Sequence, residues 1–159
     1  MSPLILDEWL WADLLGENGV ERQKQASAFL LAIRTICNPI VIVKGSKFER
    51  KTFNFWKNAG FDATLRKIAK FYRSEFWSNS VKTIRIEAGQ LKPLWGDLQK
   101  QVNPDDHYIL QAYFTIQKCV IVTTDTRLKP LLDSKNIDCK YRDEFVSEYL
   151  AKFRKMQAP

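Results

Sequence analysis

Residues 103–132 read NPDDHYILQAYFTIQKCVIVTTDTRLKPLL and predict a helix, a buried strand and a second helix in succession. Asn103 and Pro104 are typical of a helix start, because asparagine caps free N–H groups and proline fits the first turn. Residues 119–122 form an apolar run without alternation, as expected of a strand that is buried on both faces. The chain then returns as a helix over residues 128–136. This succession favours a parallel sheet with helices on its two faces.

Two further buried strands are predicted in the N-terminal part of the chain. Residues 4–6 (Leu-Ile-Leu) and 40–43 (Ile-Val-Ile-Val) are short apolar runs of the same kind. Ser46 and Glu49 have the spacing of a capping box, so a helix should begin near residue 47. Three segments have apolar residues at helical spacing and are predicted as helices: residues 20–36, 47–60 and 61–76.

The C-terminal part of the chain adds weaker patterns. Residues 81–86 and 137–141 predict short strands, and residues 144–153 predict an amphipathic helix. With 159 residues, 45% of them hydrophobic, the chain can bury one substantial core. We therefore expect a single domain over residues 1–159. Its predicted fold class is α/β, a three-layer α/β/α sandwich around a twisted, mostly parallel sheet of four to five strands.

The charge and the cysteine content of the chain favour some classes of function over others. A net charge of +7 and a pI near 9.4 favour a phosphate-rich partner. The three cysteines are odd in number and far apart, which fits neither a disulfide framework nor a zinc site and favours a reducing, cytoplasmic setting. Acidic residues interrupt the apolar N-terminal stretch, so we expect neither a signal peptide nor a membrane span.

Four acidic residues are predicted to share one edge of the sheet. The carboxyl ends of parallel strands lie at one edge, where such folds place their ligands. Asp7 and Asp125 directly follow predicted strands, Glu49 lies in the first turn of a helix, and Asp106 opens another helix. Each has an ordinary alternative: a strand-end turn for Asp7, a capping box for Glu49, a favourable helix-dipole position for Asp106, and a turn for Asp125.

Gathered together, these acids create an electrostatic cost. Two carboxylates 4 Å apart repel by about 4 kcal/mol at an effective dielectric constant of 20, so four of them require raised pKa values or a cation. The chain has a single histidine, His107, so the candidate ligands are all oxygens. Such a set favours Mg²⁺ or Mn²⁺ over zinc.

These residues resemble the PIN-domain nucleases, a family that includes the VapC-type toxins of toxin–antitoxin pairs. Residues 103–132 are similar to the family's pattern of an acid that opens a helix, an apolar strand and Val-Thr-x-Asp, with Asp106 and Asp125 separated by 19 positions. Residues 4–15 (LILDEWLWADLL) deliver the first acid after a strand, and Glu49 fits the middle acid by order and context. Residues 139–150 (CKYRDEFVSEYL) resemble the family's final strand and closing segment.

The resemblance implies a Mg²⁺- or Mn²⁺-dependent endoribonuclease, with Asp7, Asp106 and Asp125 as metal ligands and Glu49 on the metal or its water. Thr124 and Asp105 are expected to support the site. The implied partners are RNA, an antitoxin-like protein and a second copy of the chain. The chain departs from the family's pattern at Glu8, Trp9 and Arg127. An inactive RNA-binding or protein-interaction module with the same fold, and a nuclease that acts on DNA, therefore remain open as alternatives.

Cations around the rim are the candidates for holding nucleic acid against an acidic pocket. Arg66, Lys70 and Arg73 fall on one helical face, although a solvated helix face explains such a row equally well. The tryptophans offer stacking platforms, a groove for a partner helix, or simply core residues. The nucleic-acid-binding candidates are Lys44, Lys47, Arg50, Lys51, Arg66, Lys67, Lys70, Arg73 and Arg127.

Overall fold

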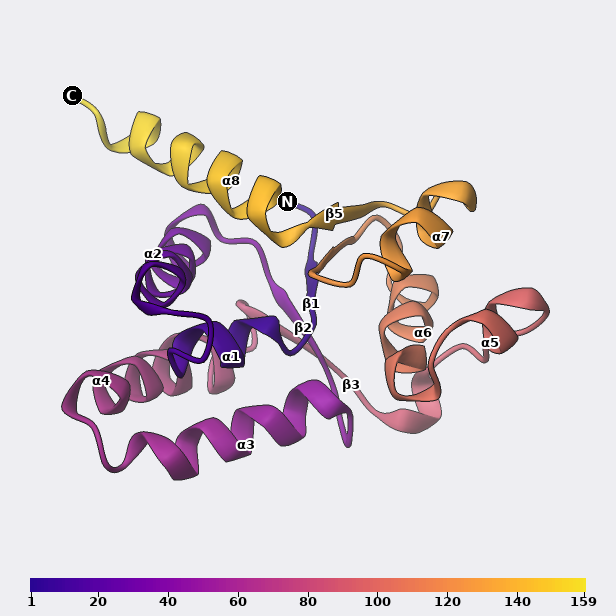
Figure 1. Ribbon diagram of the computed structural model, residues 1–159, viewed down its shortest axis with the longest axis horizontal. Helices are drawn as coiled ribbons and strands as arrows, with labels where there is room; N and C mark the ends of the chain where they lie inside the picture. Colours follow the sequence, from indigo (N-terminus) through magenta and orange to yellow (C-terminus); the bar gives the residue numbers. More distant parts are fainter.

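Five parallel strands form one sheet in the computed structural model, which describes residues 1–159 (Figure 1). Their order across the sheet is β3-β2-β1-β4-β5, and every neighbouring pair is parallel. The expected three-layer α/β/α architecture is confirmed, with an entirely parallel sheet. The strands are β1 (Leu4–Leu6), β2 (Ile40–Val43), β3 (Thr83–Ile86), β4 (Val120–Thr123) and β5 (Cys139–Tyr141).

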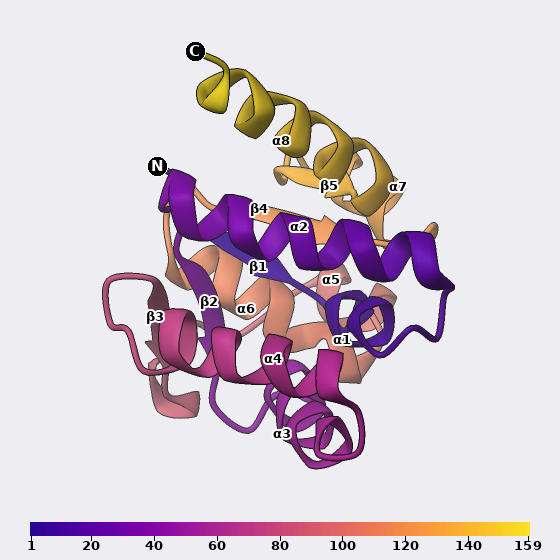
Figure 2. The ribbon, with the colours of Figure 1, turned by 90° about the vertical axis from the view of Figure 1, so that its left-hand side faces the viewer.

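Helices cover both faces of the sheet (Figures 1 and 2). One face carries α1 (Trp9–Leu14), α2 (Val20–Ile36), α3 (Lys47–Ala59), α4 (Ala63–Tyr72) and α8 (Arg142–Gln157). The other face carries α5 (Asp97–Gln101), α6 (His107–Thr115) and α7 (Leu128–Ser134). No helix is both long and apolar enough to cross a lipid bilayer.

Successive side chains of each central strand enter different cores, which explains why these strands lack alternation. Leu4 and Leu6 of β1 pack with α2 and α3, whereas Ile5 packs on the opposite face with α6. In the first core, the ring centroid of Trp11 lies 4.8 Å from that of Tyr72, edge to face. Burial on both faces requires apolar residues at every strand position.

The structure differs locally from the sequence prediction at several elements, among them α5, for which no helix was predicted. Helix α1 was not expected, because its residues 9–14 are apolar on nearly all sides and show no stripe. The helix predicted over 61–76 is divided: α4 ends at Tyr72, and a π-helical turn follows over Arg73–Trp77. The last helix begins at Arg142 and continues to Gln157, beyond its apolar stripe.

Two of the helix starts at the carboxyl edge of the sheet are capped by side chains. Asn103 Oδ1 accepts a hydrogen bond from the Asp105 N–H at 3.0 Å, which confirms the predicted cap before α6. Ser46 Oγ accepts from the Glu49 N–H at 3.2 Å, as predicted for α3. The Glu49 carboxylate accepts from the Gly45 N–H at 3.1 Å, one residue before the bond expected of a capping box.

Candidate functional site

The strand order reverses direction between β1 and β4, and ligands of open α/β sheets bind in the crevice at such a switch point. Asp7 directly follows β1, and Asp125 lies two residues after β4. Asp106 immediately precedes α6, the helix that leads into β4. A cavity of about 700 Å³ opens at this position, and its walls include Asp7, Asp106 and Asp125. We call this cavity the acidic pocket.

Asp7 is the most deeply placed acid of the pocket, with 7% of its surface exposed. Its Oδ1 accepts a hydrogen bond from the Trp9 N–H at 3.1 Å, and its Oδ2 accepts from Thr123 Oγ1 at 2.5 Å. Burial raises the pKa of Asp7 to about 7 although both hydrogen bonds lower it; the charges of Glu8 and Asp106 raise it further. The charged carboxylate is therefore costly unless a cation accompanies it.

Asp106 is half-buried, and its carboxylate makes no capping hydrogen bond to α6. Burial is the largest cause that raises the pKa of Asp106. The negative charges of Glu8, Asp125 and Asp105 add to this rise, whereas Lys47 opposes it. The place of Asp106 directly before α6 is also the helix-dipole position that the sequence suggested as an ordinary alternative. Its electrostatic interaction with neighbouring acids is the behaviour expected of a shared site.

Asp125 has both a turn role and a position in the pocket. Its Oδ1 accepts hydrogen bonds from the N–H groups of Arg127 at 2.7 Å and Leu128 at 3.0 Å, at the start of α7. Its own N–H donates to Thr123 Oγ1 at 3.0 Å. The Thr123 hydroxyl therefore links Asp125 to Asp7. One oxygen of Asp125 is used in the turn, and the other is left for a ligand.

Glu8, which was not predicted, lines the pocket, whereas Glu49 does not. The Glu8 carboxylate lies 2.6 Å from Lys47 Nζ, and both side chains are about one-third exposed. Glu49 is instead engaged at the start of α3, through Gly45. The fourth acid that the structure brings to the pocket is thus Glu8. The sequence signal is its position directly after Asp7, where the chain departs from the family's pattern.

Of the two residues predicted to support the site, one lies at the pocket and the other does not. Thr124 lines the pocket, whereas Asp105 is exposed on the helix start and contributes no wall. The threonine that holds Asp7 is the fully buried Thr123. A sequence signal for it existed, because the parallel register pairs Leu6 with Val122 and so sets the next residues, Asp7 and Thr123, side by side.

Of the predicted cations, Lys47 lies closest to the acids, through its contact with Glu8. Several others have structural partners: Lys44 pairs with Glu87, Arg50 donates to Gly45 O, Arg66 donates to Gly60 O, and Arg73 lies over the Trp56 ring. The side chains of Lys51, Lys67, Lys70 and Arg127 are exposed and make no ion pair.

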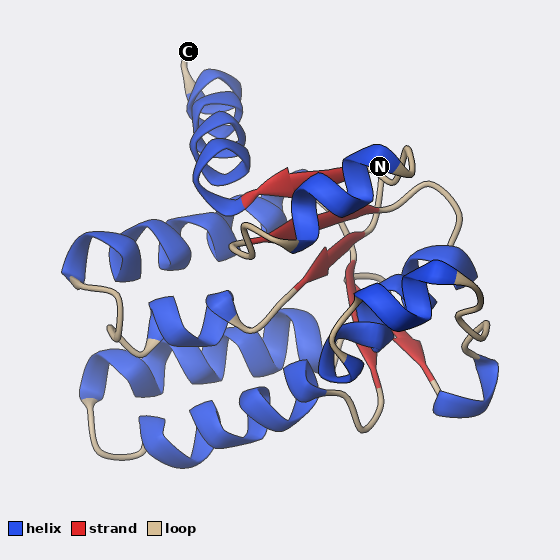
Figure 3. Cartoon of the chain, turned by 45° about the vertical axis from the view of Figure 1, so that its right-hand side comes forward, coloured by secondary structure: helices blue, strands red, loops and turns tan.

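The positive charge of the chain is concentrated in α3 and α4. Residues 44–73 contain nine Lys or Arg and two Asp or Glu, a net charge of +7 that equals that of the whole chain. Helices α3 and α4, labelled in Figure 1, lie side by side, and Figure 3 shows the same helices from another side. We call this pair the basic arm. It begins at Lys47, and therefore at the mouth of the acidic pocket.

The donor chemistry of the acidic pocket fits a hard divalent cation, because its four acids and Thr124 offer only carboxylate and hydroxyl oxygens. Asn18 and the cation Arg22 also line the pocket. The raised pKa values of Asp7 and Asp106 point in the same direction, since a cation relieves the cost of ionising them. No group of three or more His, Cys, Asp or Glu side chains is gathered closely enough to form a ready-made metal site.

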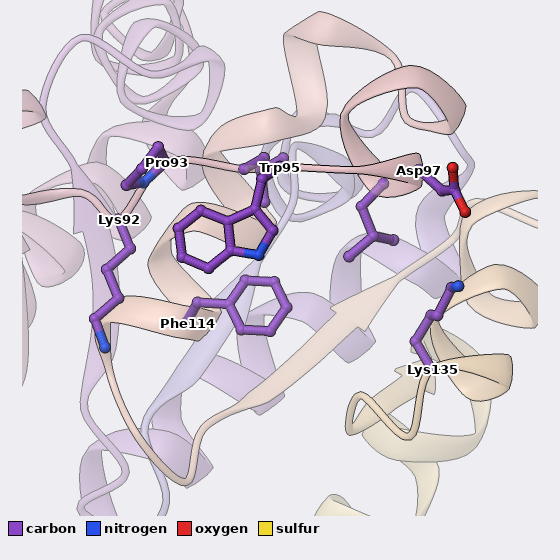
Figure 4. Close-up of a pocket in the computed structure, with 8 residues that line it drawn as sticks. Lys92, Pro93, Trp95, Asp97, Phe114 and Lys135 are labelled. Carbon is purple, nitrogen blue, oxygen red and sulfur yellow. The ribbon is translucent and has the colours of Figure 1, made fainter.

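A second hollow, of about 350 Å³, lies against the C-terminal end of α6. Trp95 and Phe114 form its apolar wall, and Lys92 and Lys135 flank it (Figure 4). Trp95 is 71% exposed, whereas Trp9 and Trp11 are buried in the core. The four acids of the acidic pocket do not line this hollow.

Fold and site together define an α/β protein with an acidic crevice at the switch point of a parallel sheet. Comparisons of the chain with protein-family models, with curated proteins and with solved structures found no match.

Proposed function

We propose that this chain is a Mg²⁺- or Mn²⁺-dependent endoribonuclease of the PIN-domain kind. The observation that supports this most strongly is the convergence of Asp7, Asp106 and Asp125 on one pocket at the switch point. Burial and mutual repulsion raise the pKa of Asp7 and of Asp106. Structural roles do not require three acids to line one pocket, whereas cation binding does. Membership of a toxin–antitoxin pair, with an antitoxin partner or a dimer, rests on the resemblance alone.

The four acids of the pocket have two roles in this proposal. Asp7, Asp106 and Asp125 hold the cation. Asp7 does so with its carboxylate fixed by the Trp9 N–H and the Thr123 hydroxyl. A bound cation of this type lowers the pKa of a coordinated water and stabilises the charge that develops on the phosphate.

Glu8 replaces Glu49 as the residue that orients the attacking water, because its carboxylate lines the pocket and that of Glu49 does not.

Substrate binding is assigned to the basic arm, because the acidic pocket itself repels phosphate. Lys47 at the mouth of the pocket would contact the phosphate nearest the site of cleavage, and its pairing with Glu8 keeps it there. The exposed Lys51, Lys67 and Lys70 would hold the strand further along the arm. Such contacts release counterions, so binding should weaken steeply with salt.

The decisive experiment is cleavage of a single-stranded RNA with Mg²⁺ or Mn²⁺. The native chain should cut, and a chelator should stop it. The double variant Asp106→Asn, Asp125→Asn should lose activity by at least about 100-fold, as expected when groups that stabilise the transition state are removed. Asp138→Asn, which changes an exposed acid outside the pocket, is the matched control and should cut normally.

Three results would count against the proposal. A native chain that cuts no RNA indicates a binding module, and equal cleavage by the double variant indicates a contaminant. Faster cleavage of the matched DNA strand indicates a DNA nuclease.

A further inference from the structure

The second hollow, against the end of α6, holds a tryptophan that the protein leaves in water. Of the five tryptophans of the chain, only Trp95 is exposed. Its ring and that of Phe114, which is 37% exposed, form the apolar wall of the hollow (Figure 4). Contact of large apolar rings with water is unfavourable, so a ligand that covers these rings would gain from the hydrophobic effect.

The chain on both sides of Trp95 is fixed to the rest of the protein. The backbone N–H of Lys92 donates a hydrogen bond to Thr115 Oγ1 at 2.9 Å, at the end of α6. Leu94 is buried in the core on the α6 face of the sheet, and Leu98 of α5 packs against that core. Trp95 therefore projects from an anchored segment. A flat ligand that stacks on a ring held in this way loses little free energy to ordering of the protein.

Two cations flank the rings. Lys92 and Lys135 line the hollow, are exposed and make no ion pair. Figure 4 shows the rings of Trp95 and Phe114 between these two lysines. Asp97 is the one acid in the lining, so the charged side chains of the hollow carry a net charge of +1. An aromatic surface with cations beside it is the arrangement that binds single-stranded nucleic acid, because bases stack on the ring and phosphates contact the cations.

The size of the hollow favours a nucleobase over a protein partner. Its volume of about 350 Å³ lies at the lower end of the range for small-molecule sites, roughly 300–1,000 Å³. A stable protein interface buries about 800 Å² on each partner. Of the large apolar side chains that are exposed, only Trp95 and Phe114 line the hollow. Two aromatic side chains bury at most about 500 Å², which is less than such an interface requires.

Helix α6 connects the hollow to the acidic pocket. Asp106 lies directly before α6, and Phe114 lies eight residues later, near its end. At 1.5 Å per helical residue, about 12 Å of helix separates the two positions. One strand of RNA is long enough to reach both.

We propose that the second hollow binds one nucleobase of a single-stranded RNA, stacked on the indole ring of Trp95. Lys92 and Lys135 contact the phosphates that flank this base. The inference rests on the proposed RNA substrate and adds a binding subsite outside the acidic pocket. It lies across the sheet from the basic arm, so a bound strand is held on both sides of the pocket.

Fluorescence anisotropy with a labelled single-stranded RNA tests the stacked base, with Asp106→Asn, Asp125→Asn protein as the parent so that the strand stays intact. Trp95→Ala should weaken binding by about 5- to 100-fold, the effect of one stacked base. Trp95→Phe keeps an aromatic ring and should recover most of the affinity, whereas Trp95→Leu, which is apolar but not aromatic, should not. Met156→Ala removes another exposed apolar side chain, on α8, and should bind normally.

Two further measurements separate stacking from charge. Against a strand of abasic sugar-phosphate units of the same length, Trp95→Ala should bind as tightly as its parent. Trp95→Ala should also keep the slope of log affinity against log salt, whereas Lys92→Ala and Lys135→Ala should each lower it by about 0.7. Trp95 is exposed, so thermal unfolding of its variants should match that of the parent. The two lysine variants test the same subsite without changing the ring.

Three results would overturn the inference: unchanged RNA affinity in Trp95→Ala, an equal loss of affinity for the abasic strand, or full affinity in Trp95→Leu. Self-association of the native chain that is lost in Trp95→Ala, while RNA affinity is kept, would identify a second copy as the occupant instead.

The outcomes also distinguish this inference from the proposed activity. If the native chain binds RNA through Trp95 and cuts none, the nuclease proposal fails and the inference stands. If it cuts RNA and Trp95→Ala binds RNA normally, the inference fails and the nuclease proposal stands.

Discussion

Thr123 Oγ1 donates a hydrogen bond to Asp7 Oδ2 at 2.5 Å, and this bond joins the end of β4 to the end of β1. The same oxygen accepts the N–H of Asp125 at 3.0 Å. One buried hydroxyl therefore sets the relative positions of two acids from different strands. Its place in the register makes this possible, because β1 and β4 are adjacent at the switch point.

Replacing Thr123 with valine tests this link. The Thr123 hydrogen bond lowers the pKa of Asp7, so its loss should raise that pKa above about 7 and favour the protonated acid. We expect a stability loss of about 1–2 kcal/mol at pH 8, where Asp7 is charged, and a smaller loss at pH 5. Urea unfolding at both pH values measures this. Thr83→Val, which removes a buried bond to Phe76 O, is the control and should cost the same at both.

The pKa of Asp7 predicts how stability changes with pH when no metal is present. A carboxyl whose pKa is raised from 3.8 to about 7 on folding binds more protons in the folded state, so its contribution to stability falls as pH rises from about 4 to 7. Asp7→Asn removes this loss. Relative to the wild type, the variant should gain stability across that range, by at most roughly 4 kcal/mol. Unfolding in the presence of a chelator measures the difference, and a difference independent of pH contradicts the account.

Glu8 and Glu49 have opposite expected effects on cleavage and on folding. Glu8→Ala should lower RNA cleavage by about 10- to 100-fold with little change in stability, because Glu8 lies at the pocket in a partly exposed ion pair. Glu49→Ala should retain cleavage and lose about 0.5–1.5 kcal/mol, because it removes the hydrogen bond from Gly45. Cleavage rates and urea unfolding of both variants decide this. A larger loss of cleavage activity in Glu49→Ala than in Glu8→Ala would show that Glu49, and not Glu8, is the fourth acid of the site.

The ion pair between Asp13 and Arg142 should matter for stability. Asp13 Oδ2 lies 2.9 Å from Arg142 Nε, and both side chains are almost entirely buried. Removal of one partner leaves an uncompensated buried charge, so Asp13→Ala or Arg142→Ala should cost about 3–5 kcal/mol. Arg22→Ala, which breaks an exposed pair with Asp143, should cost less than about 1 kcal/mol. Equal losses in the three variants, measured by urea unfolding, would show that burial does not set this cost.

The basic arm predicts a salt-dependent contribution to RNA binding. Lys67→Ala and Lys70→Ala remove exposed charges that have no ion-pair partner. Each should weaken binding and lower the slope of log affinity against log salt by about 0.7, the value for one phosphate contact on a single strand. Fluorescence anisotropy with Asp106→Asn, Asp125→Asn protein avoids cleavage during the titration. Lys152→Ala, on the exposed face of α8, is the control and should leave the slope unchanged.

The fold was predictable because its three central strands are short apolar runs that the two cores require at every position. Residues 4–6, 40–43 and 119–122 appear in the sheet within one residue of their predicted bounds. Helix α1 escaped prediction because Trp9, Leu10 and Trp11 are all buried, so no polar face marks it as a helix.

The site was predictable where it depends on topology and not where it depends on side-chain direction. Asp7, Asp106 and Asp125 reach the pocket because strand ends and helix starts meet at one edge. Glu8 and Glu49 could not be ranked from the sequence, since both lie near that edge and only their hydrogen bonds separate them.

A crystal of the protein soaked in Mn²⁺ tests the central claim most directly, through the anomalous signal of the metal. The account predicts a strong peak in the acidic pocket, within coordination distance of carboxylate oxygens of Asp7, Asp106 and Asp125. The peak should disappear in the Asp106→Asn, Asp125→Asn variant. A pocket that stays without a peak at millimolar Mn²⁺, or a peak that binds only outside it, would contradict the account.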